Sequence, residues 1–358
     1  MNGYLELGLF LPSTKGGLVM ARNLPSEREA TWGLNKEVVL AAEASGMEFA
    51  LSQVKWRGYG GESGHWDGAQ ESFTLMAGLA AVTSKIKLIA SVAVRTINPA
   101  VAAKMAATID DIADGRFALN IVAGWNKFEY AQMGLWSDDD YYLNRYDYAD
   151  EYLTILRRLW TEDGVTFDGK YFKLEDCRSN PKPKAPLKIV SAGQSEGALA
   201  FVARHSDYSF IGRMNDSAKQ LGELARKIAG LAADQGRSVT SYTLLNVVAG
   251  RTHEEAEARK AKYMADRDEV AIEEWLRVSG FDKNRADYQT LPPETTTFMS
   301  VPYIVGSHEK IAAHLDSLAQ YGVGGVALCF PDFEKDVPDF IANVLPRMAS
   351  RQNAMIRT

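Results

Sequence analysis

Short apolar runs alternate with amphipathic segments along this chain. Eight such runs lie at residues 5–11, 49–52, 86–94, 117–122, 187–191, 208–211, 242–249 and 325–330. Each is too short for a helix and ends at glycine, proline or polar residues, which is typical of buried strands. Most are followed by a segment with apolar residues at helical spacing, such as 99–112, where Pro99 occupies a favoured first position. The pattern therefore predicts a regular strand and helix series.

Eight strands with intervening helices in 358 residues predict an α/β protein, a single (β/α)8 barrel domain with insertions. A doubly wound open sheet is the alternative, because a linear pattern does not establish closure. Residues 161–187 are expected to be an insertion, since Asp168-Gly169 is a hairpin signal and three prolines follow it. Residues 253–302 are charged and then rich in proline and threonine, which predicts a second insertion or a mobile lid.

Composition and charge exclude several classes of function. The chain has 40 basic and 46 acidic residues, a formal charge of −6 and no basic run, which argues against nucleic acid as a partner. No stretch approaches the roughly 18 consecutive apolar residues of a membrane span, and no secretory signal precedes the first strand, so we expect a cytoplasmic protein. Cys177 and Cys329 are far apart and have no metal-ligand spacing, so neither a disulfide nor a metal site is expected.

The glycine-rich motifs point to an anion and not to a dinucleotide. Residues 322–327 match the letters G-x-G-x-x-A, but they lead from a helix into a strand, the reverse of the order that binds pyrophosphate. Ala192-Gly193-Gln194-Ser195 instead joins a strand to a helix, where backbone N–H groups and a hydroxyl would suit a phosphate. A simple helix N-cap at Ser195 is the alternative, and the two roles are compatible.

Two polar residues stand at positions where barrel enzymes place their chemistry. Asn120 interrupts the apolar strand at 117–122, and a buried carboxamide needs hydrogen-bond partners. We expect it to face a ligand; the alternative is an asparagine that caps neighbouring backbone. His65 lies in the loop after the second strand, at the end of a barrel where active sites form, and is a candidate substrate contact.

Several strings of residues carry a family resemblance. They are Glu71-Ser72-Phe73-Thr74-Leu75-Met76-Ala77-Gly78-Leu79, Met105-Ala106-Ala107-Thr108-Ile109-Asp110, Gly115-Arg116-Phe117, Gly124-Trp125, Arg145-Tyr146-Asp147-Tyr148 and Ala192-Gly193-Gln194-Ser195. Over nearly its whole length the chain resembles the luciferase-like flavin monooxygenases. That resemblance implies a (β/α)8 barrel that uses reduced FMN as cofactor and O2 as co-substrate.

The resemblance also implies roles for individual residues. The FMN contacts would be Val54, Lys55, Asn120, Glu129, Arg145, Tyr146, Gly193 and Ser195, the last of them toward the phosphate. The oxygen pocket, which holds the catalytic positions, would be formed by Leu51, Ser91 and Asn120. The candidate substrate contacts are Gln53, His65 and Arg95. Arg95 would suit a carboxylate or sulfonate, and its alternative is an exposed arginine on the barrel rim.

Within the family, the resemblance is to the branch that oxidises pyrimidines. It implies that a small heterocyclic amide such as uracil is opened through a flavin peroxide, that a separate NAD(P)H:flavin reductase supplies reduced FMN, and that the chain forms a homo-oligomer. Ser91 stands where that branch has threonine, and Gln53, Trp56 and Arg95 also differ from it. Alternatives are therefore a sulfone or sulfonate monooxygenase, an F420-dependent dehydrogenase, and a non-catalytic flavin-binding protein.

Overall fold

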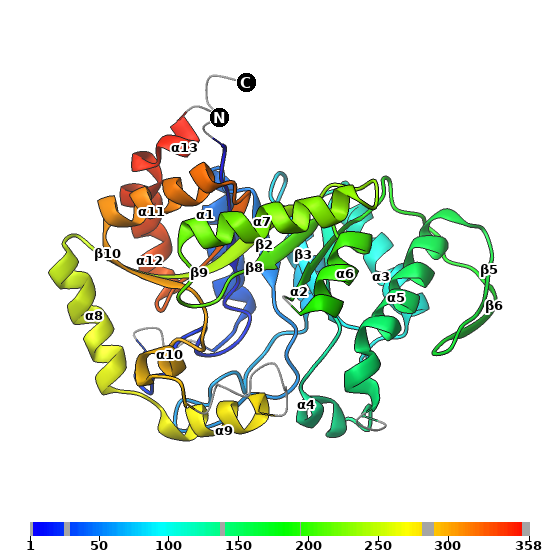
Figure 1. Ribbon diagram of the computed structural model, residues 1–358, viewed down its shortest axis with the longest axis horizontal. Coiled ribbons are helices and arrows are strands. Elements are labelled where there is room, and N and C mark those ends of the chain that lie inside the picture. The colour runs from blue at the N-terminus through cyan, green and yellow to red at the C-terminus, as the bar shows by residue number, and fades with distance from the viewer. Residues whose placement is uncertain (1–2, 25–28, 137–139, 194, 281–289, 353–358) are drawn as a thin grey trace.

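Eight parallel strands close into a barrel in the computed structural model, which describes residues 3–24, 29–136, 140–193, 195–280 and 290–352. In order around the barrel the strands are β1 (Glu6–Phe10), β2 (Phe49–Ser52), β3 (Lys87–Ala93), β4 (Phe117–Val122), β7 (Lys188–Ala192), β8 (Tyr208–Ile211), β9 (Thr240–Gly250) and β11 (Gly325–Cys329). Strand β9 pairs with both β8 and β11, and β11 pairs with β1 (Figure 1). The predicted (β/α)8 barrel is confirmed, and the open sheet is wrong.

Successive side chains along each strand point alternately into the barrel and toward the surrounding helices, and this alternation builds two apolar layers. In β2, Phe49 and Leu51 belong to the cluster inside the barrel, whereas Ala50 belongs to the large cluster between the strands and the surrounding helices. Inside the barrel the rings of Phe49 and Tyr242 stack with centroids 5.1 Å apart. Tyr242 is near the start of β9, and Phe49 begins β2, so these rings fill the end of the barrel where strands begin. The opposite end is left for polar groups.

Seven helices of the described ranges cover the barrel. They are α1 (Trp32–Ala44), α2 (Ser72–Val82), α3 (Pro99–Ile112), α5 (Asp140–Thr161), α6 (Glu196–His205), α7 (Ala218–Ala233) and α11 (His308–Tyr321). All of them except α5 begin at an observed side-chain cap. Ser217, for example, forms a complete capping box with Gln220 at the start of α7. A short helix that the pattern did not predict, α4 (Lys127–Ala131), follows β4. None of the helices in the described ranges has the length and apolar character needed to cross a membrane.

The chain's last helical region is broken into several short pieces. It consists of α12 (Phe333–Asp339), a π-helical turn (Phe340–Val344), a 3-10 turn (Leu345–Arg347) and α13 (Ala349–Gln352). Pro338 lies inside α12 and Pro346 inside the 3-10 turn. Each proline lacks a backbone N–H donor and so removes one hydrogen bond from the helical ladder, which weakens regular α-helix in this region.

The segment at 161–187 contains an antiparallel hairpin. Strands β5 (Val165–Asp168) and β6 (Lys173–Cys177) pair as the Asp168-Gly169 signal predicted, and they extend beyond α5, away from the barrel (Figure 1). Because they pair only with each other, the nine-stranded sheet is unaffected by them.

The segment at 253–302 forms helices α8 (His253–Ala265), α9 (Glu269–Ser279) and α10 (Pro293–Thr297); residues 281–289 lie outside the described part of the chain. A ninth strand that the pattern did not single out, β10 (Tyr303–Ser307), pairs with the second half of β9. Helices α9 and α10 lie at the end of the barrel where the strands finish (Figure 1). This segment therefore stands over the end at which barrel enzymes bind their ligands.

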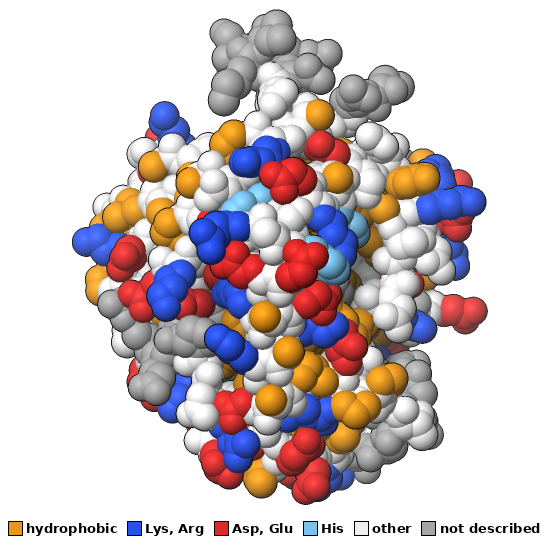
Figure 2. All heavy atoms as spheres, turned by 90° about the vertical axis from the view of Figure 1, so that its left-hand side faces the viewer, with side chains coloured by type: hydrophobic (Ala, Val, Ile, Leu, Met, Phe, Trp, Pro, Cys, Tyr) orange, Lys and Arg blue, Asp and Glu red, His pale blue; other side chains and the backbone are white. Residues whose placement is uncertain are grey.

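The face that carries α8 is a mixture of charges. Basic and acidic side chains are interspersed with apolar ones over it (Figure 2). Lys260 pairs with Glu257 within α8, and Arg251, which precedes the helix, pairs with Glu255 in its first turn. No continuous basic surface is visible on this face.

A buried carboxylate fastens α9 to the loop after β2. Asp268, 1% exposed, caps α9 and accepts hydrogen bonds from the Ser63 backbone N at 2.7 Å, the Ser63 hydroxyl at 2.6 Å and the Ala271 N at 3.2 Å. At Gly61, a Cβ atom would lie 2.4 Å from an Asp268 carboxylate oxygen, so only glycine permits this approach. Burial opposes ionisation of Asp268, but the hydrogen bonds from Ser63 and Ala271 outweigh it and lower its pKa.

We predict that Asp268→Asn lowers the free energy of unfolding by about 2 kcal/mol at neutral pH, because a buried donor loses its acceptor. A lowered carboxyl pKa contributes stability above the ordinary pKa and loses it as pH falls through the folded value. The difference from wild type should therefore shrink below about pH 5, as urea denaturation at several pH values would measure.

The control is Asp168→Asn in the hairpin, where the carboxylate side chain is 80% exposed and the change should stay within about 0.5 kcal/mol. Equal stability of wild type and Asp268→Asn at pH 7 would contradict the account of this contact.

Candidate active site

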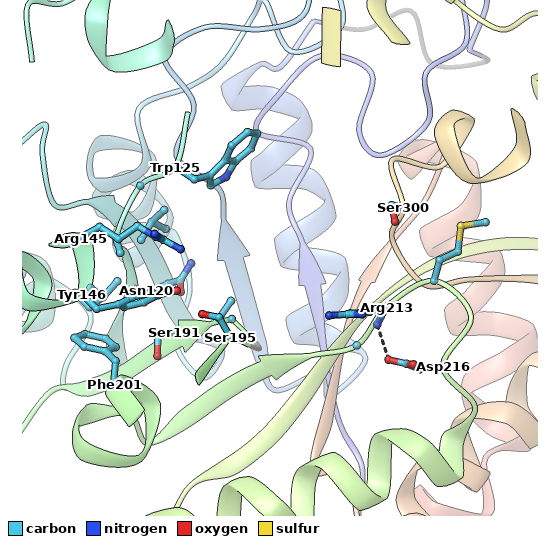
Figure 3. Close-up of a pocket in the computed structure, with 18 of the residues that line it drawn as sticks. Asn120, Trp125, Arg145, Tyr146, Ser191, Ser195, Phe201, Arg213, Asp216 and Ser300 are labelled. Atoms are coloured by element: carbon cyan, nitrogen blue, oxygen red, sulfur yellow. Dashed lines mark hydrogen bonds between the residues drawn. The ribbon is translucent and has the colours of Figure 1, made fainter. Parts of the chain in front are cut away.

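A cavity of about 750 Å³ opens at the carboxyl ends of β4, β7 and β8 (Figure 3). Its walls come from β4 and the loop after it, from α5, from the β7–α6 and β8–α7 loops, and from the segment at 253–302. The residues that line it include Asn120, Trp125, Arg145, Tyr146, Gly193, Ser195, Phe201, Gly212, Arg213, Asp216, Leu291, Thr295 and Ser300. The cavity lies where strand ends of a closed barrel meet, which is the usual place for an active site in this fold.

Five predicted cofactor residues line this cavity together. They are Asn120, Arg145, Tyr146, Gly193 and Ser195, contributed by β4, α5 and the β7–α6 loop. The other predicted positions lie outside its lining: Leu51, Gln53, Val54, Lys55, His65, Ser91, Arg95 and Glu129. The structure thus separates one group that a ligand in the cavity could touch from another that lies behind or beside it.

Asn120 is held from behind by a chain of hydrogen bonds through the barrel wall. Its Nδ2 donates to the Ser91 Oγ at 2.8 Å, and that hydroxyl donates to the Ser52 carbonyl oxygen at 2.6 Å. A carbonyl can only accept, so the single hydroxyl proton of Ser91 is committed to Ser52 and Ser91 must accept from Asn120. This fixes the orientation of the carboxamide. Its Oδ1 is buried and has no hydrogen-bond partner among the described residues.

Lys55 and Glu129 form a buried ion pair beside the cavity. The Lys55 Nζ lies 3.1 Å from a Glu129 carboxylate oxygen, and the two side chains are only 5% and 8% exposed. The other Glu129 oxygen accepts from the Trp56 backbone N at 2.5 Å. Burial disfavours the charged form of Lys55, but electrostatic attraction and hydrogen bonds to Tyr59 and Glu129 outweigh this effect and raise the pKa of Lys55. The pair ties α4 to the loop after β2.

His65 is enclosed away from the cavity. It is fully buried, its ring stacks on Trp66 with centroids 5.4 Å apart, and its Nε2 lies 3.2 Å from the Met299 sulfur. Burial lowers its pKa to about 3, so the ring is neutral at physiological pH. This placement counts against direct contact with substrate, and the predicted role stays a prediction.

Arg95 and Gln53 have partners within the protein. The Arg95 Nε and Nη2 donate to the Leu135 carbonyl oxygen at 3.0 and 2.5 Å, and its guanidinium lies 4.7 Å from the centre of the Tyr141 ring. Arg95 is therefore not an exposed rim arginine, and its donors fix the loop after α4. The Gln53 side chain donates to the Thr14 hydroxyl.

The β7–α6 loop has the geometry of an anion site. Gly193 has φ of 137°, and a Cβ atom there would lie 2.5 Å from the Ala198 Cβ, so glycine is required. Ser195 is the N-cap of α6, and its Oγ accepts from the Ala198 N at 3.3 Å. Gln194 lies outside the described residues. The N-cap is thus observed, and the positive end of α6 faces the cavity.

Arg213 is a cavity residue that the sequence did not reveal. It follows β8 directly after Gly212 and belongs to no motif. The one available signal was positional, because it is the first charged residue after a strand that ends next to β7. Ser195 was identified by a different signal, the Ala192-Gly193-Gln194-Ser195 segment that joins a strand to a helix.

The comparisons agree with this fold. A family model described as "Luciferase-like monooxygenase" matches residues 5–324. The chain belongs to this family and is therefore an enzyme of the flavin-dependent monooxygenase class.

Among curated relatives, Pyrimidine monooxygenase RutA of Methylobacterium radiotolerans is 42% identical over 356 residues, which cover 98% of this chain and 93% of the relative. RutA of Caulobacter vibrioides is 43% identical, covering 97% of this chain and 99% of the relative. The crystal structure of DmoA from Hyphomicrobium sulfonivorans matches with a TM-score of 0.82 at 20% identity, over 98% of this chain and 89% of that one, and shows the same fold.

We predict that Glu129→Gln lowers the free energy of unfolding by about 3 kcal/mol, because Lys55 is left as a buried charge without its counter-ion. The double variant Lys55→Met with Glu129→Gln should recover most of that loss, since it removes both charges and keeps the acceptor for Trp56. Urea denaturation of the three proteins measures both effects. A double variant no more stable than Glu129→Gln alone would contradict the ion-pair account.

Proposed function

We propose that this enzyme uses reduced FMN and O2 to oxidise a small heterocyclic amide such as uracil, with opening of the ring. The observation that carries the proposal is identity of 42% and 43%, over almost the full length, to two pyrimidine monooxygenases. The ring opening balances as follows: the amide C–N bond would break, the two atoms of O2 would join the carbonyl carbon as a peracid, and the two hydrogens of reduced FMN would be shared between that peracid and the released nitrogen, which leaves FMN oxidised.

The residues of the cavity fit FMN. Its volume of about 750 Å³ lies within the range of roughly 300–1,000 Å³ that is usual for cofactor pockets. Trp125, Tyr146 and Phe201 supply flat apolar surface for an aromatic ring system, while Ser195 and the α6 N-terminus suit a phosphate. The buried Oδ1 of Asn120 lacks a partner that a ligand N–H group would supply.

In this proposal, Gly193 and Ser195 hold the phosphate, Arg145 and Tyr146 flank the cofactor, and Asn120 orients its ring. Reduced FMN, when bound, supplies the two electrons for oxygen activation. Leu51 and Ser91, which are 3% and 2% exposed, would complete the oxygen pocket behind Asn120.

The remaining predicted cofactor residues would act at the edge of the site. Val54 and Lys55 belong to the loop after β2, and the buried pair of Lys55 with Glu129 holds that loop against α4. We propose that this ion pair positions the loop after β2 beside the cofactor.

The segment at 253–302 is proposed as the cover of the site and the segment at 161–187 as a peripheral insertion of the same single domain. Leu291, Thr295 and Ser300 from the first segment line the cavity wall. Its closed position would exclude water from the reacting groups, which strengthens electrostatic interactions there.

We propose that a separate NAD(P)H:flavin reductase supplies the reduced FMN. The glycine motif at residues 322–327 leads from a helix into a strand, which is the reverse of the order in a dinucleotide site. We propose a cytoplasmic location, where that reductant is available, and a homo-oligomeric assembly.

The test is a substrate screen in which an added reductase regenerates reduced FMN under air. Uracil should lose its ring absorbance, and mass spectrometry should show an oxygenated, ring-opened product. Turnover of a sulfonate or sulfone with none of any pyrimidine would overturn the substrate. Binding of F420 in place of FMN, with turnover in the absence of O2, would overturn the reaction class, and FMN binding without any turnover would indicate a non-catalytic protein.

We predict that Asn120→Ala lowers the rate of oxygenation at least tenfold, equivalent to about 1.4 kcal/mol in the activation barrier, while the fold stays intact. The fold should survive because, among the residues that the structure describes, the carboxamide donates to Ser91 alone. The control is Asn144→Ala on α5, where the side chain donates to the Asp140 carbonyl oxygen of its own helix. Wild-type turnover by Asn120→Ala, with unchanged circular dichroism, would remove Asn120 from the mechanism.

A further inference from the structure

We infer that Arg213 binds the phosphate monoester of the flavin, opposite Ser195, and so makes the cavity selective for FMN over riboflavin. This inference rests on the proposed function for its ligand. The residue itself is identified by its place in the fold and by its unused hydrogen-bond donors.

A rigid turn presents Arg213 to the cavity. Gly212 precedes it with φ of 120°, and a Cβ atom there would lie 2.9 Å from the Thr243 hydroxyl oxygen. Asp216 then closes the turn twice: its backbone N donates to the Arg213 carbonyl oxygen at 3.0 Å, and its carboxylate accepts from the Arg213 backbone N at 2.7 Å. The backbone of Arg213 is therefore fixed before any ligand arrives.

The two arginines of the cavity differ in what their guanidinium groups already bind. The Arg145 guanidinium donates to the Tyr142 carbonyl oxygen and lies 4.1 Å from the centre of the Tyr142 ring. Across the part of the chain that the structure describes, the Arg213 guanidinium has neither a hydrogen bond nor an ion pair, and its residue is exposed. One Asp216 carboxylate oxygen accepts from the Arg213 backbone N–H and not from its guanidinium, so Arg213 keeps its side-chain donors for a ligand.

Strand pairing brings Arg213 and Ser195 to the same end of the barrel. Strands β7 and β8 are parallel neighbours, with Ala192 opposite Phe210, so the loops that follow them leave side by side. Both residues line the cavity, and Figure 3 shows the Arg213 side chain extending toward Ser195. A phosphate between them would accept from the α6 N-terminus on one side and from a planar guanidinium on the other.

The test compares two ligands that differ only in the phosphate. Oxidised FMN and riboflavin are titrated into wild type and Arg213→Gln, and binding is followed by flavin fluorescence. We expect wild type to bind FMN more tightly, Arg213→Gln to lose about tenfold in FMN affinity, and riboflavin affinity to stay unchanged. Inorganic phosphate should compete with FMN on wild type and should not weaken riboflavin binding.

The matched control is Arg178→Gln, next to the hairpin, where the side chain is 67% exposed and pairs with Asp176 outside the cavity. It should leave both affinities unchanged. Equal loss of FMN and riboflavin affinity in Arg213→Gln would overturn the inference, because it would indicate a contact to the ring system or a damaged fold.

Unchanged FMN affinity in Arg213→Gln with a raised KM for substrate would also overturn the inference, because it would assign Arg213 to the substrate. Failure of wild type to bind either flavin would instead overturn the proposed function, and this inference with it.

Discussion

The pairing of β9 on both of its edges is the constraint on which the site depends. The first half of this eleven-residue strand lies between β8 and β11, and its second half pairs with β10. Closure by β9 forces all eight strands to end on one rim, so that residues from β4, β7 and β8 face a common cavity. Stacked rings at the other end, Phe49 on Tyr242, leave only this rim for a ligand.

Polar groups at the rim are held by neighbours before a ligand binds. Asn120 is oriented through Ser91, and Lys55 is neutralised by Glu129 behind the loop after β2. Burying such groups costs free energy unless they are paired, so their partners limit them to one arrangement. The result is a cavity whose walls are ordered by the barrel itself, which reduces the reorganisation needed when a cofactor binds.

The sequence predicted those features that depend on neighbours along the chain. All eight barrel strands followed from apolar runs, the helix caps followed from residues such as Ser195, and Asn120 was identified because a polar residue interrupts an apolar strand. Features that depend on contacts across the fold were not predictable. Burial of His65 against Met299 and the binding of Arg95 to the Leu135 carbonyl oxygen arise only when distant segments meet.

The central claim is that this barrel rim is a flavin site where O2 delivers an oxygen atom to the substrate. The most direct measurement is turnover of uracil with reduced FMN under isotopically heavy O2, followed by mass spectrometry of the ring-opened product. The account predicts that the product carries heavy oxygen derived from O2. A product whose added oxygen comes from water, or equal turnover without O2, would contradict it.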